Sequence, residues 1–302
     1  MQIGEVQQPL SSLIRGDVLF GQSMREHTSW RIGGPADIMV LPACVDDIRT
    51  CVLFAREQGI PLTVMGNGSN MLVKDRGIRG IVLKISRGFN RIEIIGTTVS
   101  AEAGSLMPVV AVQAAEAGLS GLEFAAGIPA SVGGAISMNA GAHGKSIGEV
   151  VRSAVILTQD GEIRSLDREE IGFAYRKSGI REKRVVVLNA VFALEPGNPA
   201  EIKMKNQTNL KKRRQSQPLE YPNAGSVFAN PPGQWAGWLV DQVGAKGMRV
   251  GDALVSDKHA NFIVNVGAAS AADVLELVGQ IRQMVFKKFN IELKLEIQVV
   301  GE

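Results

Sequence analysis

The sequence predicts an α+β protein, and three observations lead to this fold class. Segments rich in β-branched residues and segments with helical spacing of apolar residues both occur, but they do not alternate as repeating strand–helix–strand units. The chain has 302 residues, 45% of them hydrophobic, which is enough to fill two domains or three lobes. A composition break at residues 195–199, Glu-Pro-Gly-Asn-Pro, separates a strand-rich region from one that begins with a polar, basic helix.

Charge and composition argue against several classes of protein. The formal net charge is +3 and the pI about 8.9, too little to indicate a nucleic-acid partner but suited to an anionic substrate. Aromatic residues make up 5% of the chain, too few for base-stacking platforms. No run approaches the roughly 18 apolar residues of a membrane span, and Met1–Gln8 lacks the features of a signal peptide. We therefore expect a cytoplasmic protein with no membrane insertion.

The cysteines and histidines predict neither a disulfide nor a metal site. The segment between Cys44 and Cys51 is predicted to be helical, which would place them two turns and roughly 10 Å apart, too far for a disulfide. Free thiols in a reducing compartment are expected instead. His27, His143 and His259 are far apart in the sequence and have no paired ligand spacing, so we expect no metal ion.

Apolar spacing and turn signals predict the elements before residue 200. Ile48, Cys51 and Ala55 recur at helical spacing, which predicts a helix over Val45–Gln58 that ends before Gly59. The other expected elements are strands at Leu62–Met65, Ile81–Ile85 and Val185–Leu194, hairpins at Arg91–Ile95 with Val99–Ala103 and at Val150–Thr158 with Glu162–Leu166, and helices at Met107–Ala117 and Asp167–Gly172.

The region after residue 200 is predicted to hold two long helices and a terminal strand. Ala271–Phe289 has an apolar face that includes Val274, Val278 and Ile281, which is typical of an amphipathic helix. Leu293–Val300 alternates as a half-buried strand does. Further helices are expected at about Ala200–Gln215 and Trp235–Val243, and a strand at Asn261–Val266.

One run of small residues, Gly127–Gly141, is the most informative segment of the chain. It reads Gly-Ile-Pro-Ala-Ser-Val-Gly-Gly-Ala-Ile-Ser-Met-Asn-Ala-Gly and has almost no bulk or charge. Such a run lets the main chain approach a large ligand closely, and successive N–H groups bind anions. Residues 131–140 also have helical spacing, which is typical of a tightly packed small-residue helix. The two interpretations are compatible, as a loop that leads into a helix whose N-terminus faces a phosphate.

A second glycine-rich segment, Gly66-Asn-Gly-Ser-Asn70, lies upstream. Position 71 is Met, where a dinucleotide fingerprint needs its third glycine, so the segment is not that motif. On its own it is equally well read as an ordinary turn. Together with Gly127–Gly141 it indicates a phosphate-bearing cofactor that is held by backbone N–H groups.

Two further motifs have ordinary interpretations. Lys211-Lys-Arg-Arg214 is typical of a solvated helix end, with phosphate or carboxylate binding as the functional alternative. Ser226 has no Gly-x-Ser-x-Gly context, which argues against a hydrolase.

Several segments in order resemble the UDP-N-acetylenolpyruvoylglucosamine reductase family. They are His27-Thr-Ser-Trp-Arg-Ile-Gly-Gly-Pro-Ala-Asp37, Gly66–Asn70, Gly127–Gly141, Tyr175-Arg-Lys-Ser178, Asn223-Ala-Gly-Ser-Val-Phe-Ala-Asn-Pro231, His259-Ala-Asn-Phe262 and Leu293-Lys-Leu-Glu-Ile-Gln-Val299. They span nearly the whole chain, and the ordered set is highly specific. Because Arg181-Glu-Lys-Arg184 leads directly into a predicted strand, the chain resembles the branch without an inserted loop and its substrate-contacting tyrosine.

The resemblance implies a fold and a domain order. The fold is an FAD-binding domain of the vanillyl-alcohol-oxidase type with two α+β lobes, followed by a C-terminal α/β substrate-binding domain. We expect an N-terminal extension at 1–24, the FAD-binding domain at 25–198 with lobes of about 25–65 and 66–198, and the substrate-binding domain at 199–302. No oligomer is required for this arrangement.

The resemblance also implies the reaction: NADPH reduces non-covalently bound FAD, and the flavin N5 then gives hydride to the enolpyruvyl ether of UDP-N-acetylglucosamine. Ser226 is implied as the proton donor, with Arg176 and Glu296 as active-site partners. A guanidinium such as that of Arg176 holds a carboxylate bidentately. An ionised Glu296 would oppose enolate charge, so we expect it to be protonated or to order Arg176 or a water.

The binding residues carried over from the resemblance form two sets. The expected cofactor-binding residues are Ile32, Gly66, Asn67, Gly68, Ser69, Asn70, Gly127, Ile128, Ser131, Gly133, Gly134, Asn139, Ala140, Gly141 and His143. The expected substrate-binding residues are Tyr175, Arg213, Arg214, Gln217, Asn230 and His259. Two alternatives stay open: an FAD-dependent oxidase or dehydrogenase of the same fold, and a non-catalytic nucleotide-sugar-binding protein.

Overall fold

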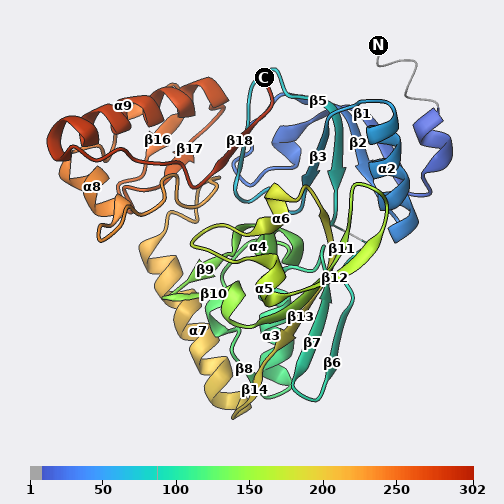
Figure 1. The fold of residues 1–302 in the computed structure, drawn as a ribbon. Coiled ribbons are helices and arrows are strands. Elements are labelled where there is room, and N and C mark those ends of the chain that lie inside the picture. The colour runs from blue at the N-terminus through green and yellow to red at the C-terminus, as the bar shows by residue number, and fades with distance from the viewer. Residues whose placement is uncertain (1–8, 87) are drawn as a thin grey trace. The chain divides into compact units, whose positions relative to one another are not determined.

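The computed structural model describes residues 9–86 and 88–302, which fall into two compact units (Figure 1). Unit 1 comprises the chain up to Phe20, Ile38–Asn67 and Gly80–Arg213, and unit 2 comprises Gly21–Asp37, Gly68–Arg79 and Arg214–Glu302. The prediction that Met1–Gln8 is no signal peptide lies outside the described residues. Among the described residues, no helix is long and apolar enough to cross a membrane.

The larger sheet of unit 1 has the strand order β12-β11-β13-β7-β6, and all of its neighbours are antiparallel. Helix α4 packs on β13 and β7, and α5 packs on β11 and β12. The elements are β6 (Ile92–Ile95), β7 (Thr98–Glu102), α4 (Val132–Met138), β11 (Val151–Leu157), β12 (Ile163–Asp167), α5 (Arg168–Ile171) and β13 (Val186–Ala193).

A second sheet has the order β1-β2-β5-β3, and β3 is parallel to β5. Strands β1 (Asp17–Ser23), β2 (Pro35–Leu41) and β5 (Ile78–Lys84) run across the boundary between the units, whereas β3 (Leu62–Met65) belongs to unit 1. Helix α2 (Val45–Glu57) meets the turn between β11 and β12: Arg56 pairs with Asp160, and Arg49 Nε donates to the Gly161 carbonyl at 3.0 Å. The predicted Asp160-Gly161 turn therefore also ties the two sheets together.

The remaining elements complete unit 1. They are α3 (Met107–Glu116), β8 (Leu119–Ser120), η2 (Glu123–Ala125), β9 (Gly141–Ala142), β10 (Lys145–Ser146), η3 (Ile147–Glu149), α6 (Gly179–Glu182), β14 (Glu195–Pro196) and α7 (Pro199–Ser216), of which α7 extends past the unit boundary. One hydrophobic core runs through unit 1 and includes Phe192, Ile48 and Met107. Leu10 and Ile14, from the predicted N-terminal extension, are buried in the same core.

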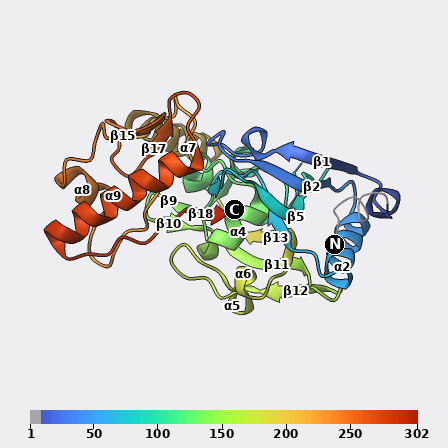
Figure 2. The ribbon, with the colours of Figure 1, turned by 90° about the horizontal axis from the view of Figure 1, so that it is seen from above.

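Unit 2 is built from three separate stretches of chain. Its elements are η1 (Met24–Glu26), β4 (Met71–Val73), α8 (Ala236–Gln242), β15 (Arg249–Val250), β16 (Ala253–Val255), β17 (Ile263–Asn265), α9 (Ala271–Phe289) and β18 (Gln298–Val300). Strand β18 pairs in parallel with β4, and α8 lies beside α9 (Figure 2). Its core includes Trp30, Ile32 and Leu72. The Asp75 carboxylate accepts the N–H groups of Ala271 and Ala272 at the start of α9, at 2.7 and 2.9 Å.

The predicted α+β class is confirmed, and most predicted elements are found within a few residues of their expected bounds. The predicted strand over Leu293–Val300 is wrong in extent, since only Gln298–Val300 is a strand. The reason is a change of partner: Glu296 N donates to the Val227 carbonyl, and Gln298 N donates to the Asn70 carbonyl. The contact-based units do not follow the expected domain ranges, and those ranges stay a prediction.

Asp47 stabilises the loops around the start of α2. Its buried carboxylate accepts hydrogen bonds from the backbone N–H groups of Arg15, Gly16 and Ala43 at 2.8–3.0 Å. Burial alone would raise the pKa of this carboxyl, but these donors outweigh burial and hold the pKa below its ordinary value. We expect Asp47→Asn to lower the free energy of unfolding by about 1–3 kcal/mol at pH 7, because one oxygen becomes a donor that faces N–H groups. Urea denaturation measures this.

The pH dependence provides the internal control. A carboxyl whose pKa is lowered on folding contributes stability above its unfolded pKa of about 4, and that stability is lost as pH falls through the folded pKa. The difference between the wild-type protein and Asp47→Asn should therefore shrink below about pH 4. A difference that stays constant down to pH 2 would contradict this assignment.

Candidate functional site

The two glycine-rich loops predicted from the sequence are in contact within unit 1, where residues 66 and 67 of the first loop meet the second loop. Asn67 Nδ2 donates to the Pro129 carbonyl at 2.8 Å. A Cβ atom added to Gly66 would lie 2.0 Å from Ser131 Oγ, so any side chain at position 66 would displace the second loop. The contact explains why position 66 is glycine: the Ser131 side chain occupies the space that a Cβ would need.

The free backbone donors are on the first loop. Within the described part of the chain, no residue accepts a hydrogen bond from the backbone N–H groups of Asn67, Gly68 or Ser69. Three successive N–H groups of this kind form an anion-binding loop. Gly68 has φ +65°, a conformation that glycine adopts without strain. This geometry fits the predicted phosphate-bearing cofactor.

The N-terminus of α4 differs from the expectation. Val132 N donates to the Ser105 carbonyl at 2.8 Å, Gly133 N donates to the Ala103 carbonyl at 2.9 Å, and Gly134 N donates to Ser131 Oγ. The first three N–H groups of the helix therefore already have acceptors within the protein. These three donors are therefore not free to bind a phosphate, because the loop enters the helix through a close contact with the turn after β7. The expected phosphate contact at this helix N-terminus stays a prediction.

Asn70 joins the first loop to the C-terminal segment within unit 2. Its side-chain Nδ2 donates to the Glu296 carbonyl at 3.2 Å, and its own carbonyl accepts Gln298 N at 2.9 Å. Ser29 N donates to the Gly68 carbonyl from a third stretch of chain. The residue predicted to bind cofactor thus also holds the backbone of Glu296.

The side-chain amide of Asn139 joins two neighbouring segments of unit 1. Its Oδ1 accepts Gly148 N at 2.9 Å, and its Nδ2 donates to the Ala174 carbonyl at 2.8 Å. It is buried, with φ +44°, at the end of α4. One polar group of the side chain is thus occupied by η3 and the other by the residue before Tyr175, and the expected role of Asn139 in cofactor binding stays a prediction.

Tyr175 and Arg176 are the two central residues of a turn closed by backbone hydrogen bonds between Ala174 and Lys177. The Arg176 guanidinium lies 5.5 Å from the centre of the Tyr175 ring, and Tyr175 is 58% exposed. A Cβ at Gly141 would lie 3.0 Å from Arg176 Nη1, so the glycine leaves room for the guanidinium. Arg176 has φ +54°, which holds its side chain in a backbone conformation that is uncommon for arginine. Ala140 packs against the core of unit 1 beside this loop.

Basic groups gather at the end of α7 in unit 1. The Arg213 side chain lies against Gly127, and burial lowers the pKa of its guanidinium, which remains charged at neutral pH. Burial is also the largest cause that lowers the pKa of His143, followed by the charges of Lys212 and Arg213. His143 is therefore neutral at pH 7, next to cations that suit an anionic ligand.

Ser226 and Glu296 are brought together in unit 2. Val227 O accepts Glu296 N at 2.8 Å, and Ala229 N donates to the Lys294 carbonyl at 2.9 Å. Leu295 forms a bridge with Phe228 between these two bonds. The two predicted catalytic residues thus lie on paired backbone segments, whereas Arg176 belongs to unit 1.

The remaining predicted residues of unit 2 have separate surroundings. Asn230 Oδ1 accepts Ala236 N at the start of α8 at 2.9 Å. Gln217 Oε1 is buried with no hydrogen-bond donor among the described residues, as expected of an atom that meets a ligand. Burial is the largest cause that lowers the pKa of His259, and its Nδ1 accepts Asn261 N. Arg214 is exposed, and its carbonyl accepts Lys258 Nζ at 2.7 Å.

Two expected cofactor residues are hydrophobic and buried. Ile32 is in the core of unit 2, where its carbonyl accepts Thr28 Oγ1, and Ile128 is in the core of unit 1. The sequence interpretation did not single out Asn261, whose side chain bonds to both backbone groups of Phe228. Asn261 is part of His259-Ala-Asn-Phe262, one of the segments that resemble the family, and this position could have identified it from the sequence.

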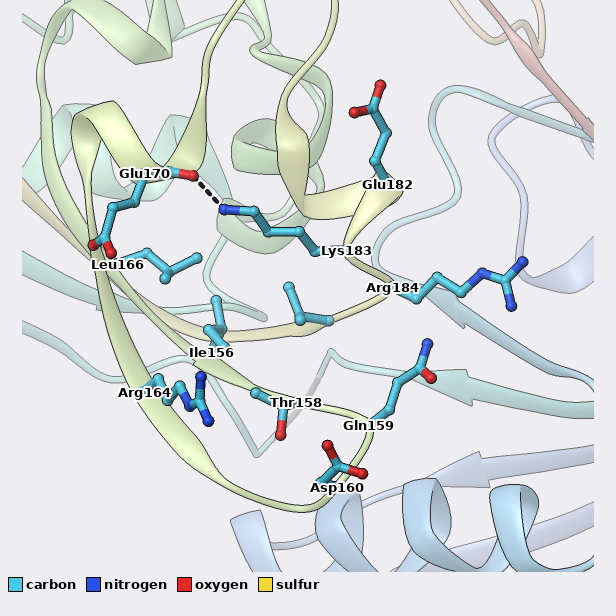
Figure 3. Close-up of a pocket in the computed structure, with 11 residues that line it drawn as sticks. Ile156, Thr158, Gln159, Asp160, Arg164, Leu166, Glu170, Glu182, Lys183 and Arg184 are labelled. Atoms are coloured by element: carbon cyan, nitrogen blue, oxygen red, sulfur yellow. Dashed lines mark hydrogen bonds between the residues drawn. The ribbon is translucent and has the colours of Figure 1, made fainter.

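The pocket drawn in Figure 3 has a volume of about 570 Å³ and contains none of the predicted site residues. It lies beside the turn between β11 and β12 and is lined by Arg164, Lys183 and Arg184 among others. Arg164 pairs with Glu162, and Lys183 Nζ donates to the Glu170 carbonyl. In residues 9–86 and 88–302, no group of three or more His, Cys, Asp or Glu side chains could hold a metal ion.

Comparisons with known proteins match two parts of the chain to family models. Residues 217–300 match the family model described as UDP-N-acetylenolpyruvoylglucosamine reductase, C-terminal domain, and residues 36–167 match the model of an FAD binding domain. A protein of Desulforamulus reducens named UDP-N-acetylenolpyruvoylglucosamine reductase is 46% identical over 293 residues, 97% of each chain. A protein of Carboxydothermus hydrogenoformans with the same name is 45% identical over 303 residues, 100% of each chain.

A solved structure is similar over nearly the full length. The crystal structure of UDP-N-acetylenolpyruvylglucosamine reductase from Thermus caldophilus has a TM-score of 0.82 and 36% sequence identity, and the match covers 95% of this chain and 100% of that one. The likeness therefore extends through both glycine-rich loops and the segments that carry Arg176, Ser226 and Glu296.

Proposed function

Because the chain belongs to the UDP-N-acetylenolpyruvoylglucosamine reductase family, we propose that it reduces the enolpyruvyl ether of UDP-N-acetylglucosamine to UDP-N-acetylmuramate, a precursor of peptidoglycan. FAD is the cofactor and NADPH the hydride donor. The observation that carries the proposal is the contact of two glycine-rich loops, the first of which has three successive N–H groups without an acceptor among the described residues. The protein acts in the cytoplasm, without membrane insertion or a nucleic-acid partner, and needs no oligomer.

The cofactor assignment rests on unit 1 and the adjoining loop. The N–H groups of Asn67, Gly68 and Ser69 bind the diphosphate of FAD, and the contact between Gly66 and Ser131 sets the spacing of the two loops. The segment Gly127–Gly141 presents small residues to the flavin. When bound, FAD carries the electron pair of NADPH to the substrate as a hydride from N5. We keep the proposed ranges 25–198 for the cofactor domain and 199–302 for the substrate domain.

The chemistry of the residues follows from where charge develops. Hydride addition to the methylene carbon leaves negative charge on the adjacent carbon and its carboxylate, and the Arg176 guanidinium stabilises that charge bidentately. Ser226 gives a proton to the same carbon, which completes reduction of the double bond. Glu296, hydrogen-bonded through its backbone to the segment of Ser226, is protonated or orders Arg176 or a water.

Binding of the nucleotide-sugar falls to the basic and polar residues at the end of α7 and in unit 2. Arg213 and Arg214 suit the diphosphate, because guanidinium groups form charge-assisted hydrogen bonds with phosphate oxygens. The buried Oε1 atom of Gln217 can accept a hydrogen bond from the nucleotide-sugar. Tyr175, Asn230 and His259 complete the proposed set.

The proposal predicts a two-step change in the visible spectrum. The purified protein should have a flavin absorption band that NADPH bleaches under anaerobic conditions and that UDP-N-acetylglucosamine enolpyruvate restores. The product should be UDP-N-acetylmuramate, identified by mass.

The alternatives give different spectra. A flavin band that NADPH cannot bleach would favour another FAD-dependent oxidase or dehydrogenase. A band that bleaches but is not restored by this substrate would overturn the substrate assignment. A protein that holds no flavin, even after FAD is added, would leave the nucleotide-sugar-binding protein as the function.

A further inference from the structure

The side-chain amide of Asn261 makes the backbone hydrogen bonds that a neighbouring strand would make to Phe228, two residues after Ser226. Its Oδ1 accepts Phe228 N at 2.9 Å, and its Nδ2 donates to the Phe228 carbonyl at 2.8 Å. The side-chain amide thus satisfies both backbone groups of one residue, as a neighbouring peptide would. Asn261 is only 4% exposed, so water cannot substitute for either bond without rearrangement.

The segment that follows Ser226 has further backbone hydrogen bonds, to Asn261 and to the segment of Glu296. Val227 N donates to the backbone carbonyl of Asn261 at 2.9 Å, while the Val227 carbonyl accepts Glu296 N. Ala229 N donates to Lys294 on the Glu296 side. On the N-terminal side of Ser226, Gly225 N donates to Asn223 Oδ1 at 3.0 Å, and Gly225 has φ +78°. Ser226 therefore lies between a flexible glycine and a segment whose position depends on Asn261.

We infer that Asn261 is the positioning residue for proton transfer from Ser226, an inference that rests on the proposed function. A serine hydroxyl is a weak acid, so its efficiency depends on correct distance and angle to the carbon that it protonates. A displacement of about 1 Å is enough to cost about 100-fold in rate. Without the Asn261 amide, the Phe228 N–H and carbonyl would be buried without partners, and the segment would shift to find new ones.

The test compares Asn261→Ala with Asn265→Ala. Asn265 is a matched control, since it is 3% exposed, lies in unit 2 and, like Asn261, bonds through its side chain to backbone groups, which here belong to Trp30, Gly267 and Ala269. Both variants should lose stability to a similar extent. We expect Asn261→Ala to slow reoxidation of the reduced flavin by the enolpyruvyl substrate by about 10- to 100-fold, with NADPH reduction of the flavin unchanged. Asn265→Ala should leave both half-reactions near the wild-type rates.

Two further measurements separate positioning from general loss of structure. The solvent deuterium isotope effect on reoxidation should rise in Asn261→Ala, because the proton transfer becomes slower than hydride transfer. In a Ser226→Ala background, Asn261→Ala should slow reoxidation by less than about twofold, since residues that act as a unit are not additive. Asn261→Asp keeps the acceptor for Phe228 N and loses the donor to the Phe228 carbonyl. Its rate of flavin reoxidation should therefore lie between those of the wild-type protein and Asn261→Ala. It also serves if the alanine variant does not fold.

The outcomes are distinct. Equal reoxidation rates in the Asn261 and Asn265 variants would overturn the inference, and so would full additivity with Ser226→Ala. Failure of the proposed function would be seen in the wild-type protein, before any variant is compared. Its reduced flavin would not be reoxidised by the enolpyruvyl substrate.

Discussion

Ser226→Ala should leave reduction of the flavin by NADPH intact and slow its reoxidation by the enolpyruvyl substrate by about 100- to 10,000-fold, the usual contribution of a positioned acid. Ser226 is half-buried, next to a backbone that is bonded to both Asn261 and Glu296. Removal of the hydroxyl deletes the proton donor without disturbing these backbone bonds. Stopped-flow absorption of the flavin band, with each half-reaction measured separately, tests the prediction.

A second serine of unit 2 provides the control. Ser270 accepts Asp273 N and caps α9, so Ser270→Ala should cost about 1 kcal/mol of stability and leave both half-reactions unchanged. If Ser226→Ala reoxidised as fast as the wild-type protein, the proton would come from another group, and the role assigned to Ser226 would be wrong.

Gly66→Ala should produce a protein that is purified with little or no flavin. The added Cβ would lie 2.0 Å from Ser131 Oγ and 3.1 Å from Ser131 Cβ, so the two loops must move apart. That movement changes the spacing between the free N–H groups of the first loop and the small-residue segment of the second. The ratio of flavin to protein absorbance, before and after incubation with excess FAD, measures the loss.

Two variants make this experiment specific. At Gly279, in α9, a Cβ would meet nothing within 4 Å, so Gly279→Ala should retain its flavin. In Gly66→Ala, the added change Ser131→Ala removes the atom responsible for the closest contact and should restore part of the FAD binding. Full flavin content in Gly66→Ala would show that the cofactor does not depend on the contact between the loops.

Local patterns predicted the helices well and the sheets less well. Helix α9 has its expected bounds, Ala271–Phe289, because an apolar face, a Ser270 cap and a final Asn290 all indicate the same helix. Strand β2 was not predicted: Pro35–Leu41 is almost continuously buried near its end and lacks alternation. The terminal strand was placed too early because alternation alone does not say which neighbour a strand pairs with.

The candidate site was predictable where backbone chemistry determines it. Small residues at Gly66–Asn70 and Gly127–Gly141 predicted that the main chain closely approaches a large ligand. The structure brings the two loops into contact at Gly66 and Ser131, and the approach to a ligand stays a prediction. The side-chain bonds of Asn70, Asn139 and Asn261 join segments far apart in the sequence. An asparagine has the same local pattern whether it meets a ligand or a distant carbonyl, so these roles could not be predicted from spacing.

The composition of unit 2 limits how this protein can be recombined. Its core takes Trp30, Ile32 and Leu72 from early segments, β18 pairs with β4, and Asp75 caps α9. A fragment that begins at residue 199 would lack all of these contributions. The C-terminal region is therefore not an exchangeable cassette, and a chimera with a relative joined at residue 199 would inherit a mismatched core unless positions 21–37 and 68–79 came from the same parent.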